Sequence, residues 1–295
     1  MKVLNPNNIP TPLFKLLSQD DHDITGSDVS ITSLLQPGQI QMLTRQHWKD
    51  LTINCEENLC VTLGKLLHKA LAEVEGNAIT EERFFKTFDL GDLGSVTVSG
   101  AIDYYDPFAE GGPILCDYKL VTANGLKSGI RDEWIAQTNC YKYLIEQAGM
   151  PTPTKLQIVA VIKDWSKNQA QANPEYFQSP IQILDIPIWA DTEEFLIARL
   201  KAFQRTKLHG ICECCSPEDT WQQPDVFKVQ KIGATRSTKN FATREEAMLY
   251  LEGNANADKY EIRCCKGEPI RCKHFCRVSQ FCPQYQQYLQ DQASK

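Results

Sequence analysis

The feature that most constrains the fold of this 295-residue chain is an apolar segment with two charged residues in its middle. Residues 114–121 have the sequence ILCDYKLV, which is typical of a buried β-strand. Asp117 and Lys119 are two positions apart, so on a strand both side chains point to the same face of the sheet. Burying charged groups without partners is costly, and the pair therefore predicts a functional site on this strand.

Periodic segments on both sides of this strand predict an α/β fold. Apolar residues at helical spacing favour helices over residues 59–74, 131–148, 191–208 and 243–251. Short apolar runs between turn residues favour further strands at 96–102, 156–165 and 182–188. This succession of helices and strands predicts a mixed central sheet flanked by helices.

Composition divides the chain into three parts. Residues 1–30 are polar and show no sustained period, so a loose N-terminal segment is expected. Residues 31–209 contain most of the periodic segments and are expected to form the core. Residues 210–295 are cysteine-rich and are expected to form an irregular, metal-binding segment packed on that core.

A second carboxylate occurs before the charged strand. Asp103 follows the segment VTVSGAI, where a neighbouring strand is expected to end. A carboxylate beside a carboxylate and a lysine on the next strand forms a site for a divalent cation, and oxygen ligands suit Mg²⁺ or Mn²⁺. Such an ion can activate a bound water and stabilise charge on a phosphate.

Three helical residues are weaker candidates. A single helical histidine such as His68 is by itself more typical of a structural residue. Gln137 and Tyr141 are four positions apart, so they share a helix face with Trp134. An amphipathic helix accounts for the two aromatic residues but less well for Gln137.

Four short motifs occur in order: G-x-x-x-H (64–68), G-x-I-D (100–103), D-Y-K (117–119) and Q-x-x-x-Y (137–141). Together they resemble the RecB-like branch of the PD-(D/E)XK nucleases over about residues 60–200. The resemblance implies a restriction-endonuclease-like core. The sequence departs from the family name at one position, because Ile102 stands where a proline would precede the first aspartate.

The same resemblance implies roles for the site residues. The implied ligands of Mg²⁺ or Mn²⁺ are His68, Asp103, Asp117 and the carbonyl oxygen of Tyr118. Lys119 would position or activate the attacking water. Gln137 and Tyr141 would orient the site or contact substrate phosphates.

The twelve cysteines are unevenly placed, and eight of them lie between residues 212 and 282. Cys116 and Cys140 are isolated and fit small buried apolar residues. Cys272, Cys276 and Cys282 have the spacing C-x3-C-x5-C in a segment too short for a core of its own. Since disulfides are rare in the cytosol, this spacing predicts a metal centre.

The segments CSPEDTW and RCKHFCRVSQFCPQY are similar to segments of phage-type nucleases in the same branch. This similarity implies that a [4Fe-4S] cluster is held by Cys215, Cys272, Cys276 and Cys282. Four thiolates also suit Zn²⁺, which remains the alternative. The fourth ligand is open as well, and its competitors are Cys55, Cys60, Cys212, Cys214, Cys264 and Cys265.

These features predict a metal-dependent deoxyribonuclease, and an exonuclease acting in DNA processing or recombination is expected. The alternative is a catalytically inactive module that binds nucleic acid or protein and carries a structural zinc site. The complete set of acids and lysine favours the enzyme. A net charge of −6 argues against a protein that coats nucleic acid electrostatically.

The expected location is the cytoplasm of a bacterial or phage-infected cell. No apolar run approaches the roughly 18 residues that a membrane span needs, and the start MKVLNPNNIP has no apolar signal core. DNA is the expected partner, and a recombinase, a single-strand-binding protein or a helicase are candidate protein partners.

Overall fold

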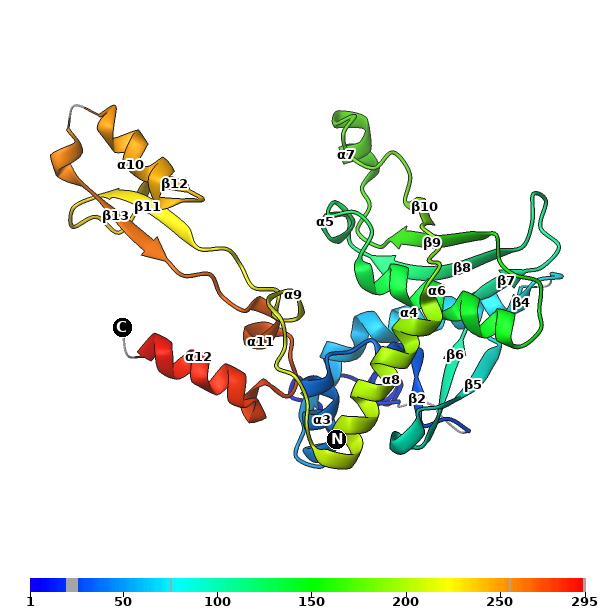
Figure 1. Cartoon of the computed structure of the whole chain (residues 1–295). Helices are drawn as coiled ribbons and strands as arrows, with labels where there is room; N and C mark the ends of the chain where they lie inside the picture. The colour runs from blue at the N-terminus through cyan, green and yellow to red at the C-terminus, as the bar shows by residue number, and fades with distance from the viewer. Residues whose placement is uncertain (20–25, 75, 255, 294–295) are drawn as a thin grey trace. The chain divides into compact units, whose positions relative to one another are not determined.

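The computed structural model describes residues 1–19, 26–74, 76–254 and 256–293 (Figure 1). They form two compact units, which are described separately. Unit 1 comprises Met1–Met42 and Trp48–Cys212, and unit 2 comprises Leu43–His47 and Glu213–Lys295. Within the described ranges, no helix combines the length and the apolar character that crossing a bilayer requires.

The centre of unit 1 is a five-stranded sheet with the strand order β10-β9-β8-β7-β4. Its strands are β4 (Ile79–Thr80), β7 (Tyr104–Asp106), β8 (Ile114–Val121), β9 (Lys155–Ile162) and β10 (Ile181–Ile186). β8 and β9 are parallel, whereas the other neighbouring pairs are antiparallel. The expected α/β fold with a mixed sheet is therefore confirmed, and the predicted strand 114–121 has the expected bounds.

Two smaller sheets complete unit 1. One has the order β2-β6-β5 and consists of β2 (Val29–Ser30), β5 (Arg83–Asp89) and β6 (Ser95–Ala101). In the other, β1 (Lys2–Leu4) pairs in parallel with β3 (Thr52–Asn54). The last residues of β6 lead directly to Asp103, as the sequence predicted.

The expectation of a loose N-terminal segment over residues 1–30 is wrong where the structure describes it. β1, the helix α1 (Thr11–Leu17) and β2 all belong to unit 1. Very short strands are stabilised by pairing with partners far away in the sequence, so no local period marks them. Residues 20–25 of the segment lie outside the described residues.

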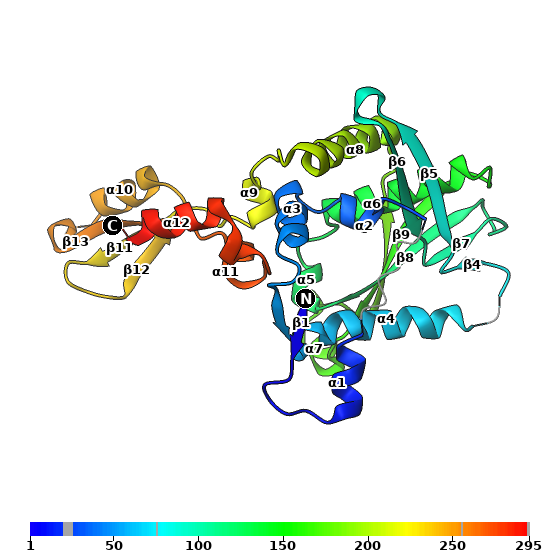
Figure 2. The same ribbon diagram turned by 90° about the horizontal axis from the view of Figure 1, so that it is seen from below.

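Helices α4 (Leu59–Ala72) and α6 (Asp132–Gln147) both pack on β8. The side chain of Lys119 reaches α6, whereas the ring of Tyr118 lies against His68 of α4, with 6.3 Å between the ring centroids. Neighbouring residues on a strand point to opposite faces, so α4 and α6 cover opposite faces of β8, as Figure 2 shows. β8 is therefore enclosed from both sides.

α6 is largely buried in unit 1. Asp132 and Glu133 in its first turn favour a helix start, and the chain leaves the helix at Gly149 with φ +76°. Leu144 and Ile145 on its inner face are fully buried in the main core. The remaining helices that begin in unit 1 are α2 (Ile31–Leu34), α3 (Gly38–Gln46), α5 (Ala123–Leu126), α7 (Lys167–Ala172) and α8 (Thr192–His209).

Unit 2 contains an antiparallel sheet with the order β12-β11-β13. Its strands are β11 (Val226–Lys231), β12 (Ser237–Phe241) and β13 (Tyr260–Cys265), and α10 (Arg244–Glu252) packs on them. The expectation of an irregular C-terminal segment is therefore wrong. The strands are short, and a register shift between Val229 and Gln230 interrupts the alternation that would have marked them.

The rest of unit 2 carries the clustered cysteines. Its short elements are α9 (Pro217–Thr220), α11 (Ile270–His274) and the 3-10 turn η4 (Ser279–Phe281), followed by α12 (Pro283–Ala293). The ring of His47 stacks on Phe281 with centroids 3.9 Å apart, which explains why Leu43–His47 belongs to this unit.

Candidate active site and cysteine cluster

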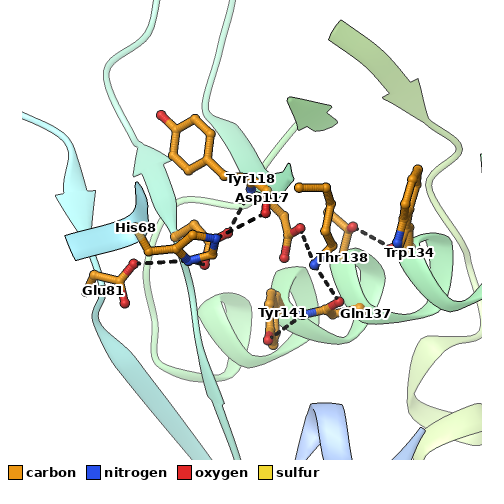
Figure 3. A network of polar contacts seen from close by, with 10 residues as sticks. His68, Glu81, Asp117, Tyr118, Trp134, Gln137, Thr138 and Tyr141 are labelled. Atoms are coloured by element: carbon orange, nitrogen blue, oxygen red, sulfur yellow. Dashed lines mark hydrogen bonds and ion pairs between the residues drawn. The ribbon is translucent and has the colours of Figure 1, made fainter. Parts of the chain in front are cut away.

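The predicted catalytic residues come from α4, the β6–β7 connection, β8 and α6, and they form one network of polar contacts (Figure 3). These elements are separated along the chain, but their side chains meet at one site. Local periodicity sets the direction of each side chain, whereas packing on both faces of β8 brings the side chains together.

His68 lies between a carboxylate and a backbone carbonyl. Its Nδ1 atom is 3.2 Å from Oδ1 of Asp103, and its Nε2 atom is 3.2 Å from the carbonyl oxygen of Tyr118. The other oxygen of Asp103 accepts a hydrogen bond of 2.7 Å from the backbone N–H of Tyr118. Three of the groups that the family resemblance implies as ligands thus lie side by side.

Asp117 is the most deeply buried acid of the site. Its side chain is 2% exposed, and Oδ2 lies 2.6 Å from Nζ of Lys119. This contact is an ion pair at hydrogen-bond distance, so the Lys119 ammonium compensates part of the cost of burying the carboxylate. Burial raises the pKa of Asp117, although the Lys119 ammonium opposes the rise. A buried carboxylate whose pKa stays raised despite one neighbouring ammonium is suited to a hard cation as a further partner.

Lys119 is held in place from α6. Its Nζ atom donates a hydrogen bond of 3.1 Å to Oε1 of Gln137, and Nε2 of Gln137 donates one of 2.8 Å to the hydroxyl of Tyr141. The first residue of the G-x-I-D motif, Gly100, packs against the ring of Tyr141. A Cβ atom at this position would lie 2.7 Å from the ring, so only glycine fits without a shift. Gly64 of the G-x-x-x-H motif has no such neighbour within 4 Å.

Glu81 belongs to the site and was not predicted. Figure 3 shows it beside His68, with Oε1 3.6 Å from Nδ1 of the imidazole. Among the described residues, His68, Glu81 and Asp103 have ligand atoms that all lie within 4.8 Å of one another. Asp103 and, to a smaller extent, Glu81 raise the pKa of His68 to about 10. Glu81 lies between β4 and β5 with φ +52°. It is outside any periodic segment, so the sequence pattern could not predict it as a site residue.

The four predicted cysteine ligands come together in unit 2. Burial, Asp219 and the thiols of Cys282, Cys272 and Cys276 raise the pKa of Cys215 to about 12. Burial and the thiols of Cys276 and Cys282 likewise raise the pKa of Cys272 to about 11. Electrostatic effects of this kind act over short distances, so the four thiols form a loose cluster in unit 2. Among the described residues, this cluster does not contain three thiols that all lie within 4.8 Å of one another.

Backbone contacts support this cluster. The side-chain amide of Gln284 accepts a hydrogen bond of 2.9 Å from the N–H of Cys215 and donates one of 2.8 Å to its carbonyl oxygen. Burial raises the pKa of Cys276, and backbone N–H groups of Val278 and Ser279 oppose that rise. Donors directed at sulfur favour the thiolate, which is the form that binds metal. Four neighbouring thiols are the donor set of a tetrathiolate centre.

The other cysteines lie in different places. Cys55, Cys60 and Cys212 belong to unit 1, Cys264 and Cys265 lie on β13, and Cys214 is exposed. Cys116 and Cys140 are buried, as expected for isolated cysteines, and their burial raises the thiol pKa to about 11 and about 12, respectively.

Comparisons with known proteins give no family assignment. No protein-family model matches the sequence, and no curated protein matches it. A solved structure described as "Crystal structure of SSO0001" aligns with 65% of this chain and 82% of its own, at 15% identity and a TM-score of 0.45. A likeness at this level carries no argument about fold or activity.

Proposed function

We propose that this protein is a Mg²⁺- or Mn²⁺-dependent deoxyribonuclease with a restriction-endonuclease-like core, similar to the RecB-like branch of the PD-(D/E)XK nucleases. The observation that carries the proposal is the pair formed by a buried carboxylate and an ammonium, Asp117 and Lys119, 2.6 Å apart on β8. A strand that served only stability would not keep Asp117 where burial raises its pKa. A cation at this position would offset the cost of burying the charge.

Phosphodiester hydrolysis needs an activated water and stabilisation of the charge that develops on phosphate. A bound Mg²⁺ or Mn²⁺ supplies a Lewis acid and lowers the pKa of a coordinated water. The groups that would hold the ion are His68, Asp103, Asp117 and the carbonyl oxygen of Tyr118, with the Glu81 carboxylate adjacent.

The contacts on α6 suggest the role of the remaining residues. Lys119 is fixed between Asp117 and Gln137, where its ammonium can orient the attacking water and neutralise a phosphate oxygen. Gln137 is fixed in turn by the Tyr141 hydroxyl. Gln137 and Tyr141 are therefore proposed to position Lys119.

The cysteine cluster has a structural role in this proposal. Cys215 precedes the strands β11–β13 in the sequence, and the other three cysteines follow them. A centre held by the four thiols would therefore connect the segment before α9 to the segment around α11 and α12. Binding a [4Fe-4S] cluster, or Zn²⁺ as the alternative, would supply folding free energy to a region with few buried side chains. None of the four cysteines belongs to the acidic site.

Exonuclease action on DNA is the expected reaction, in processing or recombination in the cytoplasm of a bacterial or phage-infected cell. A recombinase, a single-strand-binding protein or a helicase would be a suitable protein partner.

The test uses the purified chain with Mg²⁺ or Mn²⁺ and end-labelled linear or closed circular DNA. Degradation of linear DNA alone supports an exonuclease, and cleavage of both supports an endonuclease. Asp117→Asn and Lys119→Met should each lower the rate by about 10²-fold or more, whereas Asp92→Asn, at an exposed acid of unit 1, should leave it unchanged. A chain that binds DNA without cleaving it would instead support the inactive binding module.

A further inference from the structure

Three side chains of unit 1 converge on one point, and one of them, Glu81, is absent from the ligand set that the family resemblance implies. Nδ1 of His68 lies 3.2 Å from Oδ1 of Asp103 and 3.6 Å from Oε1 of Glu81. These three groups have ligand atoms that all lie within 4.8 Å of one another. Neighbouring ligands of an octahedral Mg²⁺ or Mn²⁺ ion are about 3 Å apart, so small side-chain movements would let one ion contact all three.

The backbone fixes Glu81 beside Asp103. Directly before Glu81, β4 pairs with β7 in an antiparallel register. Directly after it, the carbonyl oxygen of Glu82 accepts a hydrogen bond of 2.9 Å from the N–H of Ile102. Both contacts belong to one register, which places Glu81 opposite Asp103, and residues opposite each other on neighbouring strands have adjacent side chains. The position of the Glu81 carboxylate is therefore set by the fold.

The second ring nitrogen of His68 has an acceptor of its own. Nε2 lies 3.2 Å from the carbonyl oxygen of Tyr118, a distance at which an N–H donates a hydrogen bond. A histidine that binds a metal ion usually donates its other N–H to a carboxylate or a backbone carbonyl, and this bond fixes the tautomer. With the proton on Nε2, the lone pair of Nδ1 is directed at Asp103 and Glu81.

The backbone conformation of Glu81 supports a role for its side chain. Its φ of +52° lies in the left-handed region, which favours glycine and is uncommon for a long side chain. The side chain is 42% exposed, so burial in the core does not compensate for the strained backbone. Strained residues are concentrated at functional sites, and the carboxylate of Glu81 is directed at the imidazole of His68 (Figure 3).

We propose that Glu81 is a metal ligand, and that its carboxylate, the Asp103 carboxylate and Nδ1 of His68 bind one divalent cation. The Tyr118 carbonyl accepts the N–H of Nε2 and so holds the imidazole in the tautomer that binds the ion. Carboxylate oxygens suit Mg²⁺ and Mn²⁺, and the imidazole favours Mn²⁺ of the two. This inference rests on the proposed metal-dependent function, to which it adds a ligand and the identity of the ring nitrogen.

Calorimetry of the full chain with Mn²⁺ in the absence of DNA measures the contribution of Glu81. Glu81→Gln keeps the size of the side chain but removes its charge, and it should lower the Mn²⁺ affinity at least about 10-fold, because even residues outside the ligand shell contribute this much. Glu81→Asn, which suits the left-handed backbone better, should lose affinity likewise without losing stability. Glu82→Gln, at the adjacent exposed acid, is the matched control and should bind Mn²⁺ like the wild type.

Nitrogen NMR of the imidazole identifies the ring nitrogen that binds the ion. Zn²⁺ serves as a diamagnetic probe, because it accepts imidazole and carboxylate ligands. The signals of His68 are assigned by their loss in His68→Gln. In the Zn²⁺-loaded protein the proton should be on Nε2. A proton on Nδ1 would overturn the proposal, because Glu81 would then accept a hydrogen bond from the ring instead of sharing its ion.

The direction of the change in affinity separates a ligand from a simple ion pair. If Glu81 only paired with a protonated imidazole, Glu81→Gln would bind Mn²⁺ as tightly as the wild type or more tightly, and the proposal would be overturned. Circular dichroism verifies that the variants are folded. Failure of the nuclease function looks different, because Glu81→Gln would still lose Mn²⁺ affinity while the wild type cleaved no DNA.

Discussion

Replacing Asp117 with asparagine is expected to stabilise the metal-free protein while removing the proposed metal-dependent activity. The side chain is 2% exposed, and burial raises the pKa of the carboxyl from 3.8 to about 6 despite the neighbouring Lys119. In the unfolded chain the same group titrates near its ordinary value. At neutral pH the folded protein therefore carries a carboxylate that is more stable in the unfolded chain than in the folded one.

The magnitude follows from the difference between the two pKa values. A difference of about two corresponds to about 3 kcal/mol, and asparagine resembles the neutral carboxyl. As the pH rises from about 4 to 6, the unfolded state loses the proton of Asp117 first, so the wild type becomes less stable. The variant lacks this group, and its advantage should grow from near zero at about pH 4 to about 3 kcal/mol at pH 7.

Urea unfolding followed by circular dichroism in EDTA measures this difference. Mn²⁺ at about 100 times its dissociation constant should then stabilise the wild type by about 2.7 kcal/mol and leave Asp117→Asn unchanged. Asp92→Asn, which removes an exposed charge from the same unit, should stay within about 0.5 kcal/mol of the wild type. If Asp117→Asn were less stable than the wild type at pH 7 in EDTA, the argument that Asp117 is kept for a cation would be refuted.

Three further predictions concern other parts of the molecule. Gly100→Ala places a Cβ atom 2.7 Å from the Tyr141 ring, so a loss of about 1–3 kcal/mol in urea unfolding is expected, whereas Gly64→Ala, with nothing within 4 Å, should not destabilise. Two carboxylates raise the pKa of His68 to about 10, so a metal ion that binds its imidazole must displace a proton. The affinity for Mn²⁺, measured by calorimetry, should therefore rise about tenfold per pH unit from pH 6 to 8. A constant affinity above pH 7 would contradict this prediction. Cys276→Ser should remove the brown colour of an iron–sulfur protein purified without oxygen, or its bound zinc, and should lower its stability. A variant as stable in urea as the metal-loaded wild type would contradict the cluster.

Within single elements, the sequence by itself determined much of what the structure shows. Residues 114–121 form β8 with the expected bounds, and the two-residue period of a strand directs Asp117 and Lys119 to one face. The helical period places Gln137 within hydrogen-bond distance of Tyr141 on α6. These relations depend on backbone geometry over a few residues, so the local pattern suffices to predict them.

Only the tertiary structure decided which elements meet and what environment each group has. Glu81 reaches His68 from a turn, and Gly100 admits the Tyr141 ring, although neither contact joins neighbouring residues. The sheet of unit 2 depends on pairing between residues that are far apart in the sequence, such as Val226 of β11 and Cys265 of β13. Such contacts, and the raised pKa values of His68 and Asp117 that depend on them, arise from packing over the whole unit. A periodic pattern describes one element at a time and carries no information about the partner that packing brings to it.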